Sequence, residues 1–385
     1  VQEGGYAPSA SGTMIMPGQA GAFIDGSTSH TMLDADLSVA PTAIRTMDLS
    51  SHEKVTVGRA VDNQVVLNHP LVSRYHAVIE RMGKRFCIKD LRSSNGIYVN
   101  EERIDHEAYL KDWDQIRIGP YVFVLSGQQL QGQVEQGIRI EARNINQQVS
   151  SSLNLLKEIS LNIEPNEFVA LVGMSGAGKT TFMNAISGYW PASHGSVTVN
   201  GIDLYAHYDL FRNDIGYVPQ RDIVHQELTP EMALDFVARL RMPPDTSPAE
   251  RQATVREVLD VLDLTERRDI PIARLSGGQL KRVSIGVELL TKPRLFFLDE
   301  PTSGLDPGTE YDMMKLMRRL ADQGRTVILI THATKNVMLC DKAVFLARGG
   351  NLAFYGAPED ALEYFDEYRN ERERREKDME FDDIY

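Results

Sequence analysis

The sequence predicts a multidomain chain in which a small β-sandwich precedes a larger α/β domain. Between residues 51 and 126, short runs of β-branched and aromatic residues recur at roughly ten-residue spacing, which is typical of a sandwich. Residues 168–186 then read as an apolar strand, a glycine-rich loop and an apolar-periodic helix, as expected in an α/β domain. At 385 residues the chain is long enough for two or three domains.

Composition restricts the functions that this chain can have. The formal net charge of -13 argues against nucleic acid as the main partner, because binding to its phosphates requires a basic surface. Neither a disulfide framework nor a structural metal site is indicated, since Cys87 and Cys340 fall in different predicted domains and the histidines lack ligand spacing. No apolar run reaches the roughly 18 residues of a membrane span. A cytoplasmic location is therefore expected.

The first 50 residues are expected to form a disordered arm. They are rich in Gly, Ser, Thr, Ala and Met and show neither helical nor strand periodicity. The arm carries five threonines, which are Thr13, Thr28, Thr31, Thr42 and Thr46.

Residues 51–126 are expected to form the sandwich. The turn signals that separate its strands include Asn95-Gly96 and Gly119-Pro120. The predicted strands are Val55–Val57, Val65–Leu67, His76–Glu80, Arg85–Lys89, Ile97–Val99, Gln115–Ile118 and Tyr121–Leu125.

Several short motifs lie in the loops of this stretch, which are Gly58-Arg59, Ser73-Arg74-Tyr75-His76 and Ser94-Asn95-Gly96, followed by Asn100. With these motifs the stretch resembles a forkhead-associated (FHA) domain, a family that binds phosphothreonine peptides. A phosphate of charge about -1.5 to -2 is well suited by an arginine fork and hydroxyl donors that converge from loops. The roles that the resemblance implies are Arg59 and Ser73 holding the phosphate, Arg74 and Ser94 as supporting donors, Asn95 holding the peptide backbone, and His76 bracing the loops.

The arm offers a tethered ligand for this domain. FHA domains often favour a particular residue three positions after the phosphothreonine, and Thr31 and Thr46 are followed at that distance by Asp34 and Leu49. A flexible arm keeps its own ligand at an effective concentration that can reach the millimolar range. Thr31 is favoured over Thr46, because it has more chain with which to reach Arg59; the alternative is an inert arm and a ligand from another protein.

A Gln- and Gly-rich linker is expected at residues 127–137, and a second domain at 138–365. Within it, Gly173, Gly178, Lys179 and Thr180 match the G-x-x-x-x-G-K-[ST] pattern. The glycines let backbone N–H groups close on phosphate oxygens, and the helix N-terminus together with Lys179 attracts the anion. Thr180 suits Mg²⁺, so a nucleoside triphosphate site is predicted.

Further landmarks follow in a fixed order. Residues 274–279, Arg-Leu-Ser-Gly-Gly-Gln, open a predicted helix, and a buried strand then ends in Asp299 and Glu300. The first acid suits Mg²⁺ and the second suits polarising the attacking water. Asp306 comes next, and the strand Val327–Ile330 delivers His332 to its carboxyl end, where α/β sheets hold ligands.

The order and spacing of these motifs resemble the ATP-binding domain of an ABC transporter, an α/β P-loop fold with antiparallel β and helical subdomains. The resemblance implies an ATP hydrolase with ATP and Mg²⁺ as ligands and with Glu300 as catalytic base, helped by Gln220 and His332. The metal ligands implied are Thr180, Gln220 and Asp299. The ATP-binding residues implied are Gly173, Ser175, Gly176, Gly178, Lys179, Thr180, Thr181, Ser276, Gly277, Gly278, Gln279 and Asp306.

Within the ABC family, the sequences of residues 281–290, 331–337 and 356–359 most resemble the G subfamily, also called ABC-2 type exporters. This subfamily includes bacterial members that carry FHA modules. In that group a membrane domain follows the ATPase in the same polypeptide. The chain is therefore expected to be a piece of an exporter at the cytoplasmic face of the membrane, with residues 366–385 as a charged, solvated tail leading toward that domain. The resemblance also implies a head-to-tail dimer with a second copy and a coupling surface at Arg221–Glu231, next to helices near 232–240 and 255–264.

One departure from the family concerns the base of the nucleotide. Residues 138–163 contain no Phe, Tyr or Trp that could stack on adenine, so Val149 or a neighbour is expected to pack there instead. Aromatic stacking contributes about 0.5–1.5 kcal/mol beyond burial, and modest nucleotide affinity is expected without it.

Two other classes of function compete with the exporter. A DNA-repair ABC ATPase would insert a long coiled coil between the glycine-rich loop and Leu275–Gln279, which the resemblance identifies as the ABC signature. A translational ABC ATPase would carry two cassettes. Neither feature is present. An FHA scaffold with an inactive ATPase, which would bind phosphothreonine without a transport role, is opposed by the intact Glu300 and His332.

Overall fold

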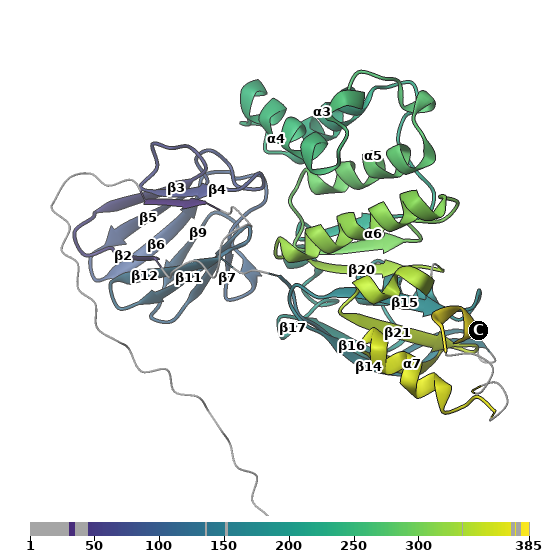
Figure 1. The fold of residues 1–385 in the computed structure, drawn as a ribbon. Helices are drawn as coiled ribbons and strands as arrows, with labels where there is room; N and C mark the ends of the chain where they lie inside the picture. Colours follow the sequence, from purple (N-terminus) through teal and green to yellow (C-terminus); the bar gives the residue numbers. More distant parts are fainter. Residues whose placement is uncertain are drawn as a thin grey trace, which may run out of the picture.

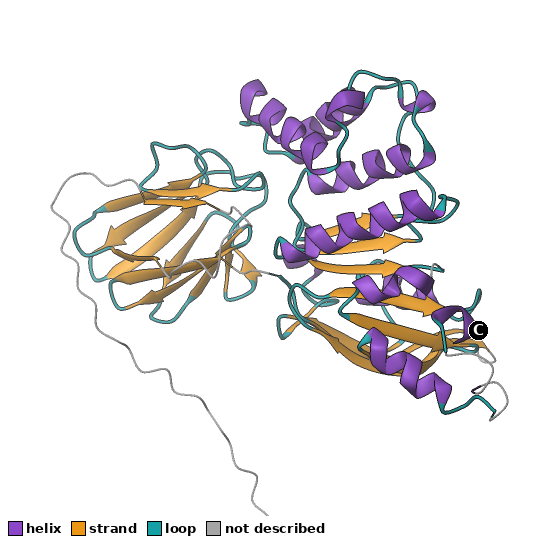
Figure 2. Ribbon diagram, viewed as in Figure 1, coloured by secondary structure: helices purple, strands orange, loops and turns teal. Residues whose placement is uncertain are grey.

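The computed structural model describes residues 31–34, 45–134, 137–150, 153–332, 334–370, 374 and 379–384. Within this part the chain forms an all-β unit followed by a unit of strands and helices, shown in Figure 1 and, by secondary structure, in Figure 2. This is the fold class that the sequence patterns predict.

The all-β unit is a sandwich of two six-stranded sheets. The first contains, in spatial order, β1 (Thr31–Asp34), β4 (Val65–Asn68), β3 (Lys54–Gly58), β5 (Ala77–Met82), β6 (Arg85–Asp90) and β9 (Glu107–Leu110). The second contains β2 (Arg45–Asp48), β12 (Gln129–Val134), β11 (Tyr121–Ser126), β10 (Gln115–Ile118), β7 (Tyr98–Val99) and β8 (Glu102–Arg103). Their inner faces bury one apolar cluster, which includes Val57, Ile79, Ile88, Tyr121 and Phe123.

Three strands correct the expected boundaries. β1 and β2 lie in the stretch that was expected to be disordered, and β12 lies in the expected linker. β1 pairs with β4, and β12 pairs with both β11 and β2. Pairing at a sheet edge uses main-chain N–H and C=O groups, so it needs no apolar alternation in the added strand. Thr13, Thr28, Thr42 and the side chain of Thr31 lie outside the described residues.

A ten-stranded sheet organises the second unit. Its spatial order is β17 (Ile202–Asp203), β16 (His194–Val199), β13 (Ile140–Ser150), β14 (Leu153–Ile163), β22 (Asn351–Gly356), β21 (Lys342–Ala347), β15 (Phe168–Gly173), β20 (Thr326–Ile330), β19 (Leu295–Asp299) and β18 (Ile215–Val218). The pairs from β16 through β13 to β14 are antiparallel, whereas β21, β15, β20, β19 and β18 run parallel to one another. The parallel part brings its strand ends to one edge, where the predicted catalytic residues follow.

The helices cover this sheet and build a separate helical subdomain, which we define as the part that contains α3, α4 and α5. Ser247 and Ser276 cap α4 and α5 in capping boxes, and Asp306 caps α6. The helices are α1 (Lys179–Ile186), α2 (Tyr208–Phe211), α3 (Pro230–Arg241), α4 (Pro248–Val261), α5 (Gly277–Leu289), α6 (Pro307–Asp322) and α7 (Pro358–Asp366).

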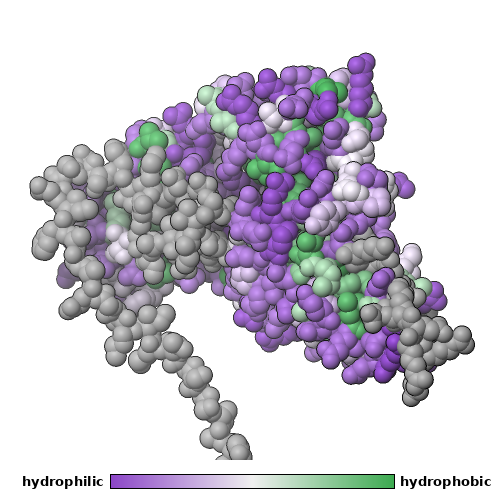
Figure 3. Space-filling view, viewed as in Figure 1, coloured by the Kyte–Doolittle hydropathy of each residue, from purple (hydrophilic) through white to green (hydrophobic). Residues whose placement is uncertain are grey.

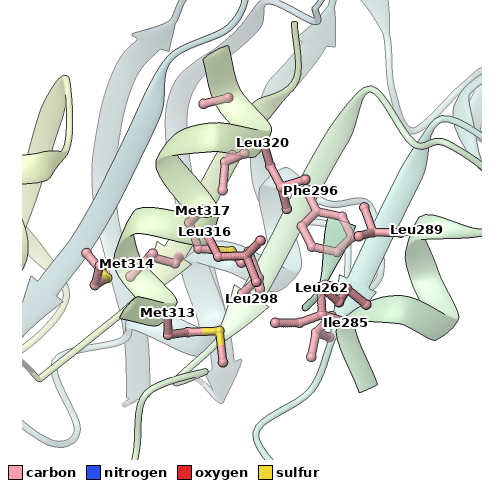
Figure 4. Close-up of a cluster of buried hydrophobic side chains, with 14 of the residues drawn as sticks. Leu262, Ile285, Leu289, Phe296, Leu298, Met313, Met314, Leu316, Met317 and Leu320 are labelled. Carbon is pink, nitrogen blue, oxygen red and sulfur yellow. The ribbon is translucent and has the colours of Figure 1, made fainter. Parts of the chain in front are cut away.

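Alternation along β15 sends side chains to both faces of the sheet. Phe168 and Ala170 join the cluster under α6 and the helical subdomain, whereas Val169 and Leu171 join the cluster that includes α1 and the antiparallel strands. Figure 4 shows Met313 and Leu316 of α6 packed among the strand residues of the first cluster. The strand before the glycine-rich loop is therefore held rigidly from both sides.

The expected solvated tail instead returns to the core. Phe381 is buried and stacks on Phe345, with ring centroids 6.2 Å apart and planes 7° from parallel. It lies in the short 3₁₀ turn Phe381–Ile384, and Ile384 packs against the same cluster. These two apolar residues anchor an otherwise charged segment, and full burial of a side chain such as that of Phe381 contributes about 1.5–3 kcal/mol.

On the face that Figure 3 shows, the coloured surface is mostly hydrophilic, with apolar patches on the second unit. Among the residues that the structure describes, no helix combines the length and the hydropathy that a membrane crossing requires.

Candidate functional site

The glycine-rich loop lies between a fully buried strand and a helix, as predicted. Gly176 and Gly178 adopt positive φ angles of 79° and 98°. A Cβ on Gly173 would meet the carbonyl oxygen of Leu346 at 2.4 Å, and one on Gly178 would meet that of Leu155 at 2.9 Å. Glycine is thus required by the close approach of two neighbouring strands, and the loop backbone stays open for a phosphate.

Lys179 and Thr180 begin α1 beside the acid that ends β19. The Nζ of Lys179 donates to the carbonyl oxygens of Gly173 and Met174, at 2.7 and 3.1 Å, so it lies folded over the loop. Burial lowers the pKa of Lys179, while Glu300 and Asp299 oppose that effect. Ser175, Gly176 and Thr181 occupy the loop and the first turn of α1 as the motif requires.

The hydroxyl of Thr180 lies 3.3 Å from Oδ2 of Asp299. Burial, and then the neighbouring charge of Glu300, raise the pKa of Asp299, although the Thr180 hydrogen bond opposes this shift. A buried carboxylate next to a hydroxyl is a pair of oxygen donors, which is the ligand type that Mg²⁺ prefers. The two residues therefore fit the cation that the motif predicts.

Glu300 lies at the centre of a three-residue arrangement. Its Oε2 accepts a hydrogen bond from Nε2 of Gln220 at 2.8 Å, and its Oε1 lies 2.9 Å from Nε2 of His332. The three residues follow three different parallel strands, β18, β19 and β20. Glu300 also adopts a positive φ of 49°, an uncommon backbone for a residue with a long side chain. The resemblance to ABC ATP-binding domains assigned these three residues to one catalytic site, and the structure brings them together.

The signature residues lie at the start of α5. The Ser276 side chain accepts the N–H of Gln279, whose own side chain accepts the N–H of Ser276. A Cβ on Gly278 would meet Thr309 at 2.4 Å, and Gly277 lies beside Leu305. In the part of this single chain that the structure describes, no hydrogen bond joins them to Lys179 or Thr180. Asp306 is likewise apart from the glycine-rich loop and caps α6 through the N–H groups of Gly308 and Thr309.

Lys281 is a site residue that the sequence reasoning missed. It is only 5% exposed, and its Nζ donates to the backbone oxygen of Gln220 at 3.0 Å and pairs with Asp222 at 3.0 Å. Asp222 also accepts the hydroxyl of Ser284 at 2.7 Å. Lys281 thereby holds the segment that carries Gln220. The available signal was a lysine on the apolar face of a predicted helix, where a charge needs a partner.

The hairpin beside the glycine-rich loop has an aliphatic end. Val149 and Leu153, at the turn between β13 and β14, are 52% and 49% exposed. The hairpin reaches the loop at Leu155, whose carbonyl faces Gly178. These exposed side chains are consistent with an aliphatic contact to the base in place of aromatic stacking.

The sandwich brings its predicted site residues together at one set of loops. The backbone N–H of Arg59 donates to the Ser73 oxygen at 3.0 Å, and its Nε donates to the Val72 oxygen at 3.0 Å. The N–H of Ser94 donates to the Ser73 hydroxyl at 3.2 Å. A Cβ on Gly58 would meet the Arg74 oxygen at 2.3 Å, so glycine lets the end of β3 approach the loop that carries Arg74.

His76 braces these loops, as predicted. It is buried, its Nδ1 accepts the N–H of Ser73 at 3.1 Å, and its Nε2 lies 3.1 Å from the Gly96 oxygen. Asn95 donates to the Leu71 oxygen at 2.7 Å. Asn100 lies apart from this set and bonds to Asp114, which gives it a structural role in its turn.

Comparisons with known proteins agree with this geometry. The family described as "ABC transporter" matches residues 156–303, and the family described as "FHA domain" matches residues 55–119. The chain is 40% identical over 309 residues to the ABC transporter ATP-binding/permease protein Rv1747 of Mycobacterium tuberculosis, covering 79% of this chain and 36% of that protein. It is 36% identical over 221 residues to ABC transporter G family member 28 of Arabidopsis thaliana, covering 55% of this chain and 20% of that protein. The chain thus spans about a third or less of the length of these relatives.

Solved structures extend the comparison to the fold. One is cbiO1 from Clostridium perfringens, part of the ABC transporter complex cbiONQ, with 27% identity, a TM-score of 0.54 and coverage of 59% of this chain and 91% of that one. Another is the dimeric ATP-binding cassette MJ0796 in a post-hydrolysis state with ADP and Pi, with 26% identity, a TM-score of 0.51 and coverage of 57% and 98%. The chain therefore joins an FHA domain, at residues 55–119, to a domain that matches the ABC transporter family, at residues 156–303.

Proposed function

We propose that this chain is the ATP-hydrolysing part of an ABC exporter whose FHA domain binds phosphothreonine. The observation that carries the catalytic half is the Glu300 carboxylate, which lies between Gln220 and His332 at hydrogen-bond distance from both. A carboxylate held on two sides is oriented toward one remaining direction, as a general base must be.

The remaining residues take roles around the triphosphate. Lys179 and the loop N–H groups bind its phosphates, and Thr180 and Asp299, with Gln220 nearby, would hold Mg²⁺. Mg²⁺ in such a site neutralises phosphate charge and aligns the oxygens. Glu300 then accepts a proton from the attacking water, while His332 and Gln220 keep its carboxylate in place.

Replacing the base tests the catalytic half. Glu300→Gln is isosteric and should retain Mg-ATP binding while turnover falls about 100-fold or more, since general bases contribute about 10²–10⁴. The matched control is Glu359→Gln, an exposed acid of α7. Near-normal turnover of Glu300→Gln, measured by phosphate release beside nucleotide binding, would show that another residue is the base.

The signature residues imply a second copy. Ser276–Gln279, at the start of α5, and Asp306, at the start of α6, lie beside each other's elements and not beside Lys179. They would therefore complete the ATP site of a partner domain in a head-to-tail dimer. The dimeric neighbour MJ0796 supports this arrangement.

An apolar groove next to Gln220 is the surface that we propose for binding to a membrane domain. The groove has a volume of 630 Å³ and is lined by Ile223, Val224, Phe236, Leu240 and Val287, among others. It includes much of Arg221–Glu231, the predicted coupling surface. We assign it to the membrane domain of an exporter at the cytoplasmic face of the membrane.

The FHA half rests on the loops around Arg59. A guanidinium, the Ser73 hydroxyl and neighbouring backbone N–H groups converge there, and together they match a phosphate. Each charge-assisted bond contributes about 1.5–3 kcal/mol, so Arg59→Ala should weaken phosphothreonine-peptide binding at least tenfold. Arg85→Ala, an exposed arginine of β6, is the control. Equal affinity for Arg59→Ala and wild type would exclude this site.

A further inference from the structure

The turn between α3 and α4 of the helical subdomain reaches into the FHA loops. Nη1 of Arg59 forms an ion pair with Oε1 of Glu250, and its Nη2 donates to the Thr246 hydroxyl at 3.1 Å. Oδ1 of Asp245 lies 3.8 Å from the same Nη2, and its Oδ2 accepts the backbone N–H of Arg74 at 2.6 Å. Three side chains of the ABC domain thus face the two arginines that the FHA motif assigns to phosphate.

The Arg59 side chain is only 7% exposed, so its charge depends on an anion nearby. Burial raises the pKa of Glu250, but hydrogen bonds from Ser247 and the charges of Arg59 and Arg74 outweigh it and leave the pKa below its ordinary value. Glu250 is therefore ionised at neutral pH. The ion pair gives this buried guanidinium its nearest counter-charge, and Asp245 lies second, at 3.8 Å.

Asp245 and Glu250 accept hydrogen bonds from the same donors that the FHA domain would offer to a phosphate. Phosphate recognition in proteins combines a guanidinium fork with N–H donors, and here carboxylate oxygens accept from both kinds of group. Asp245 and Glu250 supply negative charge on either side of the Thr246 hydroxyl without any modification of the chain. A phosphate on Thr246 would add like charge beside two carboxylates, so this contact favours the unmodified threonine.

A second contact occupies the residue that was expected to hold the peptide backbone. Nδ2 of Asn213 donates to Oδ1 of Asn95 at 3.2 Å. Nearby, the hydroxyl of Tyr98 donates to the Asp209 oxygen at 3.0 Å. Both predicted recognition elements of the FHA domain, the arginine and the asparagine, therefore have partners in the ABC domain.

We propose that the segment Asp245–Glu250 is an internal, unphosphorylated ligand of the FHA domain, which competes with phosphothreonine peptides for Arg59. The proposal rests on the proposed function of the FHA domain. It defines a docked state, in which the acids occupy the site, and a released state, in which a phosphothreonine peptide occupies it. If about one tenth of the molecules are released, the apparent affinity for the peptide is about tenfold below that of the free site.

A charge-neutral variant of the segment tests the competition in the 385-residue chain. Asp245→Asn with Glu250→Gln removes both charges, and glutamine at position 250 retains the capping box of α4. The control, Glu266→Gln with Asp269→Asn, neutralises two exposed acids of the same subdomain. A phosphothreonine peptide chosen from a randomised library should bind the first variant about tenfold more tightly than wild type or control. Equal affinity for all three proteins would overturn the proposal, and the unphosphorylated peptide should bind none.

A distance measurement separates failure of this proposal from failure of the phosphothreonine function. Spin labels at Lys84→Cys and Gln252→Cys, both exposed, report the separation of the FHA and helical parts, and the native Cys87 and Cys340 are buried. One narrow distance is expected in wild type, which lengthens or broadens in the charge-neutral variant and on addition of the phosphothreonine peptide. An unchanged distribution in the variant contradicts the internal ligand, even where the peptide binds. Absence of peptide binding in all three proteins contradicts the phosphothreonine function instead. In that case the spin-label distance in the charge-neutral variant still shows whether Asp245 and Glu250 hold the FHA domain against the helical subdomain.

Discussion

At the scale of single residues, His69 differs from the other FHA loop residues because it faces cations of the ABC domain. It is 4% exposed, its Nδ1 accepts the N–H of Leu71 at 3.3 Å, and its ring meets Tyr121 edge-on. Burial, followed by the charges of Lys292 and Arg294, lowers the pKa of His69 to about 3. The imidazole is therefore neutral in the folded chain at any physiological pH.

This depressed pKa predicts a loss of stability in mild acid. The unfolded chain binds a proton on His69 near pH 6.5, whereas the folded chain does not until about 3. Between these values the unfolded state carries more protons, so the free energy of unfolding falls as pH falls. Buried His76, whose pKa is lowered by burial, acts with the same sign.

Thermal unfolding at pH 7 and pH 5 checks this expectation. In wild type, the melting temperature of the FHA unit should be lower at pH 5 than at pH 7. This difference should be smaller in His69→Gln. Exposed His106→Gln is the control and should retain the wild-type difference. An identical pH response in all three proteins would mean that His69 is not the group responsible.

At the scale of elements, patterns carried by side chains were predicted well and pairing carried by the backbone was not. β10 begins and ends where the alternation of apolar residues placed it, and α3 extends the predicted helix by about a turn. β12 was interpreted as a linker because Gln and Gly dominate it, yet its backbone pairs along the whole of β11. In the same way, the charge of the tail concealed Phe381, whose burial depends on a ring 36 residues earlier in the chain, at Phe345.

The candidate site divides along the same line. The glycine-rich loop is local in sequence, so its residue types and spacing specify both the turn and its ligand. The resemblance to ABC ATP-binding domains assigned Glu300, Gln220 and His332 to one site, and the parallel strands that precede them bring their carboxyl ends to one edge. The contact of Arg59 with Glu250 joins residues 191 positions apart in two domains, and no local pattern in the turn between α3 and α4 marks it.

At the scale of the whole molecule, the FHA domain contacts two parts of the ABC domain. Arg59 contacts Thr246 and Glu250 at the start of α4 in the helical subdomain. Asn95 and Tyr98 instead contact Asn213 and Asp209, which precede β18 of the sheet. The helical subdomain carries the signature, and the sheet carries the glycine-rich loop. The FHA domain therefore links the two elements that the proposed head-to-tail dimer would align around ATP.

Release of this link is expected to accelerate ATP hydrolysis. Completing the ATP site of a second copy would require the helical subdomain to shift relative to the sheet. The ion pair of Arg59 with Glu250 opposes that shift. Removing the ion pair therefore raises the fraction of molecules that are competent for hydrolysis. The charge-neutral variant at Asp245 and Glu250 should then show a several-fold higher steady-state turnover than wild type, and a phosphothreonine peptide should raise turnover in wild type but not in the variant. The matched variant at Glu266 and Asp269 should follow wild type, and Glu300→Gln introduced into each background should abolish the difference. If the charge-neutral variant has equal or lower turnover, the FHA contact does not restrain the ATPase cycle. The contact would then not be energetically coupled to the alignment of the signature with the glycine-rich loop.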